Sequence, residues 1–163
     1  MVKVIVAGSR DYTDFDKVEY ELMMYFKAKG LHRADVEIVS GTARGADQLG
    51  EQFALKYGLK LTKFPADWDK YGKSAGYIRN VEMAKYADVL FAFWDGKSKG
   101  TGHMIKIATS ADLEVHVIIK PECYTAEDEE PYCIKCDYIA DANQAFCSEC
   151  GKNYWCHYRW TID

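Results

Sequence analysis

The first 120 residues of this 163-residue chain contain no cysteine, and no apolar run anywhere approaches the length that spans a membrane. All six cysteines follow residue 120, so they belong to a small C-terminal module and do not form disulfides that cross-link the main core. The N-terminus leads from Met1 straight into the short apolar run Val4–Ala7, without the pattern of a signal peptide. We therefore expect a cytoplasmic protein with no membrane partner.

Charge is divided unevenly along the chain. Residues 1–120 carry 18 Lys and Arg against 16 Asp and Glu, whereas residues 121–163 carry 3 against 9, which gives the net charge of −4. Affinity for nucleic acid comes mainly from Lys and Arg that neutralise phosphates. A nucleic-acid partner is therefore less expected than a small molecule, although a local basic patch in residues 1–120 would allow one.

Short apolar runs alternate with amphipathic stretches throughout residues 1–120. The runs that resemble strands are residues 2–7, 36–39, 60–64, 89–93 and 115–119. The stretches between them place apolar side chains three and four residues apart, as Phe15, Val18 and Leu22 do. This alternation predicts an α/β domain whose Rossmann-like, doubly wound parallel sheet has about five strands, with helices on both faces.

Three glycine-containing turns follow three of these strands. They are residues 8–11 (Gly-Ser-Arg-Asp), residues 41–47 (Gly-Thr-Ala-Arg-Gly-Ala-Asp) and residues 95–102. Glycine lets a backbone approach a ligand closely, and a helix start presents unpaired N–H groups to an anion. Because parallel strands end at one edge of a sheet, the turns should gather there and, with Arg10, Arg44 and Lys97 or Lys99, favour a phosphate-bearing ligand. For any single turn, a purely structural role is the alternative.

Five motifs in order resemble one protein family. They are residues 8–12 (GSRDY), 41–47 (GTARGAD), 64–68 (FPADW), 79–83 (RNVEM) and 93–96 (FWDG). They closely resemble the YspA-like branch of the SLOG superfamily, which is frequent in bacteria and their phages. The resemblance covers about residues 1–120 and implies a Rossmann-like domain that binds a nucleotide-derived or ribose-phosphate ligand, as a sensor or a sequestering protein.

The same superfamily supplies two alternative functions. One is that of the LOG-type phosphoribohydrolases, which are N-glycosidases acting on nucleoside 5′-monophosphates, so the chain is a possible enzyme of that kind. The other is that of DprA-like DNA-associated proteins. This chain departs from the hydrolase pattern Pro-Gly-Gly-x-Gly-Thr-x-x-Glu, because Met104 stands where the glutamate would be. Related folds often dimerise through their helices, so a homo-oligomer of this chain is a further expectation.

The turns and the resemblance together define candidate site residues. The ligand-binding candidates are Gly8, Ser9, Arg10, Gly41, Thr42, Arg44, Gly45, Arg79, Asn80, Gly96, Gly100 and Thr101. Glycosidic cleavage needs a carboxylate, so the catalytic candidates are Glu82, Asp95 and Asp47. Structural alternatives are an Arg44–Asp47 pair, a turn capped by Asp95 and a solvated helix face around Arg79 and Glu82.

The chain changes character after Lys120. Residues 121–131 form an acidic linker, and residues 132–163 contain two Cys-x-x-Cys pairs followed by an aromatic tail. Four thiolates at this spacing, Cys133, Cys136, Cys147 and Cys150, predict a zinc ribbon with a structural Zn²⁺. Reduced thiols or a redox pair are the alternatives, and Cys123 and Cys156 are left without an assigned role.

Overall fold

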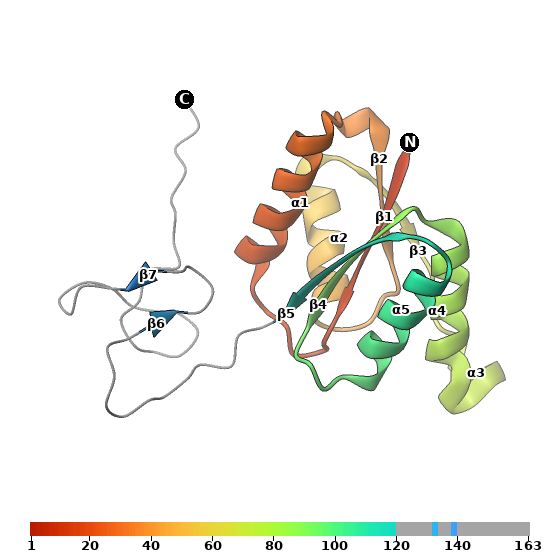
Figure 1. The fold of residues 1–163 in the computed structure, drawn as a ribbon. Helices are drawn as coiled ribbons and strands as arrows, with labels where there is room; N and C mark the ends of the chain where they lie inside the picture. Colours follow the sequence, from red (N-terminus) through yellow and green to blue (C-terminus); the bar gives the residue numbers. More distant parts are fainter. Residues whose placement is uncertain (120–131, 134–137, 140–163) are drawn as a thin grey trace. The chain divides into compact units, whose positions relative to one another are not determined.

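The structure is a computed structural model that describes residues 1–119, 132–133 and 138–139 (Figure 1). The chain divides into two units, Met1–Lys120 and Pro121–Asp163. In the second unit, β6 (Tyr132–Cys133) pairs antiparallel with β7 (Tyr138–Ile139). Only Cys133 of the four predicted zinc ligands falls in a described element; the other three, the predicted linker, Cys123, Cys156 and the aromatic tail lie outside the described residues.

The first unit alternates strands and helices as the sequence predicts. Its elements are β1 (Val2–Gly8), α1 (Phe15–Lys29), η1 (Arg33–Asp35), β2 (Val36–Ser40), α2 (Ala46–Tyr57), β3 (Lys60–Lys63), α3 (Trp68–Tyr71), η2 (Gly72–Ser74), α4 (Ala75–Tyr86), β4 (Val89–Trp94), α5 (Lys99–Ser110) and β5 (Glu114–Ile119). The five strands pair in parallel in the order β3-β2-β1-β4-β5, which confirms the predicted Rossmann-like sheet. No helix in the described part of the chain is long and apolar enough to cross a membrane.

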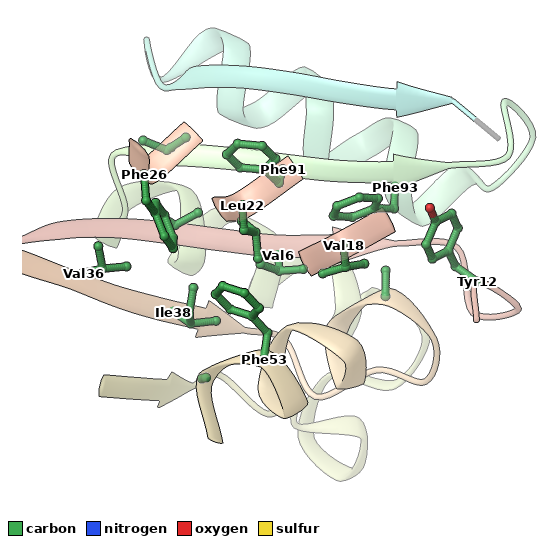
Figure 2. Packing of buried hydrophobic residues seen from close by; sticks show 14 residues of the cluster. Val6, Tyr12, Val18, Leu22, Phe26, Val36, Ile38, Phe53, Phe91 and Phe93 are labelled. Carbon is green, nitrogen blue, oxygen red and sulfur yellow. The ribbon is translucent and has the colours of Figure 1, made fainter. Parts of the chain in front are cut away.

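The sheet buries both of its faces. In β1, Val4 and Val6 face the cluster packed by α1 and α2, while Ile5 and Ala7 face the cluster packed by α4 and α5. Neighbouring residues of a strand point to opposite faces, so a strand covered on both sides is apolar at every position. Figure 2 shows the first cluster, where side chains of β1, β2 and β4 meet α1 and α2.

Two segments of the first unit show helix starts that the apolar pattern does not mark. Residues 65–76 contain α3 and η2. Helix α3 begins after Asp67, whose carboxylate accepts the Lys70 N–H at 2.9 Å. Helix α5 begins at Lys99, where the Ser98 side chain caps it by accepting the Thr101 N–H. Both segments lack an apolar repeat at the helix start, so only their caps mark where the helices begin.

Candidate functional site

The turns after β1, β2 and β4 meet at the carboxyl edge of the sheet, and Ser9 connects them. The Ser9 N–H donates to the Phe93 carbonyl at 2.9 Å, and the Ser9 carbonyl accepts the Ala46 N–H at 3.4 Å. The Ser9 hydroxyl accepts the Asp95 N–H at 3.1 Å. The three predicted turns therefore converge on one edge, as the parallel topology requires.

Two of the predicted ligand-binding glycines lie where the turns touch each other. Gly45 has a φ of 78°, and a Cβ atom there would lie 2.7 Å from the Arg10 carbonyl carbon. A Cβ on Gly8 would lie 2.7 Å from the Ala46 Cβ. Neither position has room for a side chain. These glycines allow the turn after β1, the end of β4 and the start of α2 to approach closely, and the pocket described next opens beside them.

A pocket of about 430 Å³ opens beyond the ends of β1, β2 and β3. Its volume falls within the usual range of small-molecule sites. The residues that line it come from the turns after those strands and from α3 and α4. They are Arg10, Gly41, Thr42, Ala43, Arg44, Ala66, Trp68 and Arg79. Three arginines and no carboxylate are among them, so the lining is positively charged.

Arg79 is fixed at the inner side of this pocket. Its side chain is 13% exposed, and its Nη1 donates to the Gly41 carbonyl and lies 3.8 Å from Asp47 Oδ2. Its Nε donates to Asn80 Oδ1 at 3.1 Å. Burial lowers the pKa of Arg79, and the nearby Asp47 opposes that effect. A Cβ on Gly41 would overlap the guanidinium and lie 2.8 Å from Asp47 Oδ2, so a side chain there would require Arg79 to move from this position.

Asp47 lies behind the pocket wall, in the first turn of α2. It is 3% exposed and accepts the Ala43 N–H at 3.4 Å. Burial raises the pKa of Asp47 to about 6, although Arg79 and the backbone N–H groups of Ala43, Gly41 and Gly8 favour its charged form. The alternative in which Arg44 pairs with Asp47 is not what the structure contains, because the ion pair of Asp47 is with Arg79.

Thr42 holds an unusual backbone conformation at the pocket. Its φ is 61°, which is rare for a β-branched residue. The Thr42 N–H donates to Ser40 Oγ at 3.0 Å, and that buried hydroxyl donates to Glu51 Oε1 at 2.7 Å. Lys63 in turn contacts Glu51 Oε2 at 2.5 Å. This chain of hydrogen bonds fixes the turn that carries Arg44.

Several predicted ligand-binding residues lie outside the pocket lining, near the start of α5. Asn80 is buried, and its Nδ2 donates to the Gly100 carbonyl at 3.2 Å and to His103 Nδ1 at 3.3 Å. The Thr101 hydroxyl donates to Ser98 Oγ at 3.0 Å. The two contacts of Asn80 connect α4 to α5, whereas the Thr101 contact lies within the start of α5. Gly96 has a φ of 76° in the same region, in the turn that precedes α5.

The other two catalytic candidates also lie outside the lining. Asp95 Oδ1 accepts the N–H groups of Lys97 at 2.9 Å and Ser98 at 2.7 Å. These backbone hydrogen bonds lower the pKa of Asp95 and cap the turn before α5, which is the structural alternative for this residue. Glu82 is exposed on α4. The pocket therefore collects Arg10, Gly41, Thr42, Arg44 and Arg79 but none of the three carboxylates.

The sequence did not identify the residues after β3 that form one wall of the pocket. Ala66 and Trp68 line the pocket from that side, and Ala43 completes the turn after β2. The available signal was the mixture of polar and aromatic residues in 65–76, which also suits a loop anchor. Within residues 1–119 no group of His, Cys, Asp and Glu could hold a metal ion.

The fold and the site together define a class: a Rossmann-like α/β protein with an arginine-lined pocket at the carboxyl edge of its sheet. Residues 2–71 match the YspA, cpYpsA-related SLOG family. The chain is also 37% identical over 125 residues to the Gene 61 protein of Mycobacterium phage D29, an alignment that covers 71% of this chain and 94% of that protein. The chain therefore belongs to the YspA, cpYpsA-related SLOG family, which confirms the family resemblance.

Two solved structures share the fold. DNA processing protein A (DprA) of Streptococcus pneumoniae superimposes with a TM-score of 0.59 at 18% identity, over 74% of this chain and 51% of that protein. DprA of Helicobacter pylori, described for its single-stranded DNA binding mode, superimposes with a TM-score of 0.53 at 18% identity, over 74% of this chain and 66% of that protein. This chain therefore spans about half of the first protein and less than two thirds of the second.

Proposed function

We propose that the pocket binds a small nucleotide-derived or ribose-phosphate ligand, as a sensor or a sequestering protein. The observation that carries this proposal is the gathering of three guanidinium groups, with no carboxylate, around one pocket. Arg79 is already held by Gly41 and Asp47. Arg10 and Arg44 are exposed and have no hydrogen-bond or ion-pair partner among the residues described, so they are available for bidentate contact with phosphate.

The position of the carboxylates supports binding without turnover. Cleavage of a glycosidic bond needs a carboxylate that stabilises positive charge or activates water beside that bond. Asp47 is buried behind the wall, Asp95 caps a turn, and Glu82 is exposed on α4 and is not among the lining residues. An N-glycosidase acting on nucleoside 5′-monophosphates is therefore the second candidate, favoured only by the family relationship.

A DprA-like association with DNA is the third candidate. The observation in its favour is that Arg10 and Arg44 are exposed at the edge where phosphates of a strand could also bind. The first unit has nearly balanced charge, which argues for a local contact and against a long basic track.

Titration calorimetry of the full chain tests this proposal with inorganic phosphate, ribose 5-phosphate and the four ribonucleoside monophosphates. A lost charge-assisted hydrogen-bond pair is worth about 1.5–3 kcal/mol, so Arg44→Ala should weaken binding roughly 10- to 150-fold. Arg33→Ala is the matched control, because Arg33 is exposed in η1 and does not line the pocket. An Arg44→Ala variant with unchanged affinity would contradict the assigned role.

Two further measurements separate the candidates. Chromatography of the incubated mixture detects free base, which would indicate the glycosidase. A fluorescent oligothymidylate tests DNA binding; an affinity that exceeds that of every mononucleotide and falls steeply with salt would favour the DprA-like function. Binding of a small phosphate compound without either result is the outcome that we expect.

We further propose that residues 132–163 bind one structural Zn²⁺ through Cys133, Cys136, Cys147 and Cys150. The support is the donor set itself, because four thiolates in two Cys-x-x-Cys pairs match the ligand number and spacing of closed zinc sites. Such a site leaves no open coordination position, so the metal would stabilise the second unit and would not take part in a reaction.

A further inference from the structure

Trp68 is the large apolar side chain at the pocket. It lines the pocket and yet is 53% exposed, so much of its ring is in contact with water. In the part of the chain that the structure describes, no aromatic ring or cation packs on it. An indole usually buries most of its surface, so this ring has a face available for another planar group.

The position of the ring is set by the chain around it. The Asp67 carboxylate caps α3 through the Lys70 N–H at 2.9 Å, and the Trp68 N–H donates to the Ala66 carbonyl at 3.1 Å. On the other side, a Cβ on Gly76 would lie 3.5 Å from Trp68 Cη2, so the first turn of α4 passes close to the far edge of the ring. The backbone that carries the ring is therefore fixed by hydrogen bonds, and the far edge of the ring lies near Gly76.

The pocket lining combines a positively charged part with an apolar part. Arg10, Arg44 and Arg79 supply positive charge, whereas Trp68 and Ala66 supply apolar surface. A phosphate or a sugar phosphate would use only the charged part. A ligand that joins a phosphate to a planar aromatic ring would use both parts, and a pocket of about 430 Å³ suits one such unit.

We propose that Trp68 stacks on the base of the ligand, so that the pocket selects nucleoside monophosphates over ribose 5-phosphate and inorganic phosphate. This inference rests on the proposed phosphate-binding function. It assigns different tasks to two parts of the site: the arginines hold the phosphate, and Trp68 recognises the base. Stacking depends on the π-face that all bases share, so it distinguishes nucleotides from sugar phosphates better than it distinguishes one base from another.

Calorimetry of the full chain with AMP, GMP, CMP, UMP and ribose 5-phosphate tests the inference. Stacking of one base on an aromatic side chain corresponds to roughly 5- to 150-fold in affinity. At least one nucleotide should therefore bind wild type more than about fivefold more tightly than ribose 5-phosphate does. Trp68→Ala should abolish this preference and leave the affinity for ribose 5-phosphate unchanged, whereas Trp68→Phe should keep part of it.

Two controls identify the cause. Tyr71→Ala removes another exposed aromatic side chain of α3 that does not line the pocket, and it should leave the preference unchanged. Arg44→Ala should weaken nucleotide and ribose 5-phosphate by the same factor. Circular dichroism and thermal melting of Trp68→Ala should match wild type, because the side chain is half exposed.

The outcomes separate the two proposals. Nucleotides and ribose 5-phosphate that bind wild type equally, or a Trp68→Ala variant that keeps the preference, would overturn the role of Trp68 and leave the phosphate-binding function standing. If wild type binds none of the phosphate compounds, both the proposed function and this inference are wrong.

Discussion

Asp47 permits a sharp test of the electrostatics behind the pocket. Its pKa is raised from 3.8 to about 6, chiefly by burial. A difference of about two pKa units corresponds to about 3 kcal/mol between the two protonation states. Because the folded protein prefers the neutral carboxyl group, ionisation of Asp47 at neutral pH reduces the free energy of unfolding by about that amount.

The sign and the pH range follow from the two pKa values. Below about pH 4, Asp47 is protonated in the folded and unfolded states alike, and its contribution is fully present. As the pH rises from about 4 to about 6, the unfolded chain releases the proton first and stability falls; above about pH 6 the loss is complete. Asp47→Asn cannot ionise, and its amide oxygen can still accept the Ala43 N–H.

Urea unfolding followed by circular dichroism, at several values between pH 4 and pH 7.5, measures the effect. The free energy of unfolding of Asp47→Asn minus that of wild type should increase by about 2–3 kcal/mol over this range. Glu82→Gln, which removes an exposed carboxylate on α4, is the control for the loss of a carboxylate that is not buried. A difference that decreases with pH would refute the reasoning, because it would mean that the charge of Arg79 outweighs burial.

Two other predictions concern the sheet and the second unit. Burial alone would raise the pKa of Glu37, but hydrogen bonds from Lys60, Thr62 and Tyr86 lower it to about 2. Glu37→Gln should therefore lower the free energy of unfolding, measured with urea, by about 2–3 kcal/mol. Lys29→Met, which breaks an exposed ion pair with Glu114, should lower the free energy of unfolding by less than about 1 kcal/mol. Equal losses of stability in Lys29→Met and Glu37→Gln would contradict this reasoning. Metal analysis of the purified chain should find one Zn²⁺ per molecule, lost in Cys147→Ser and kept in Cys156→Ser; a metal-free wild type would argue against the ribbon.

The elements that could be predicted from sequence are those with a local signal. The five strands are short apolar runs between helices with apolar side chains three and four residues apart, and this alternation is sufficient to predict a parallel sheet. Helix caps such as Gly30 and Gly58 carry their own signal, since both adopt the left-handed conformation that ends a helix. The short α3 has no such signal, because four residues are too few for a periodic pattern.

The sequence by itself determined the parallel sheet, the family and the gathering of glycine turns at one edge, because the strand pattern decides where parallel strands end. Only the tertiary structure decided which side chains share the pocket. Arg79 reaches the Gly41 carbonyl across 38 residues of chain, and Trp68 enters from the segment after β3. The three candidate carboxylates are not in the lining: Asp47 is buried, Asp95 caps its own turn, and Glu82 is exposed on α4. The contact between Arg79 and Gly41 joins two segments far apart in the chain, and no spacing along the sequence encodes it.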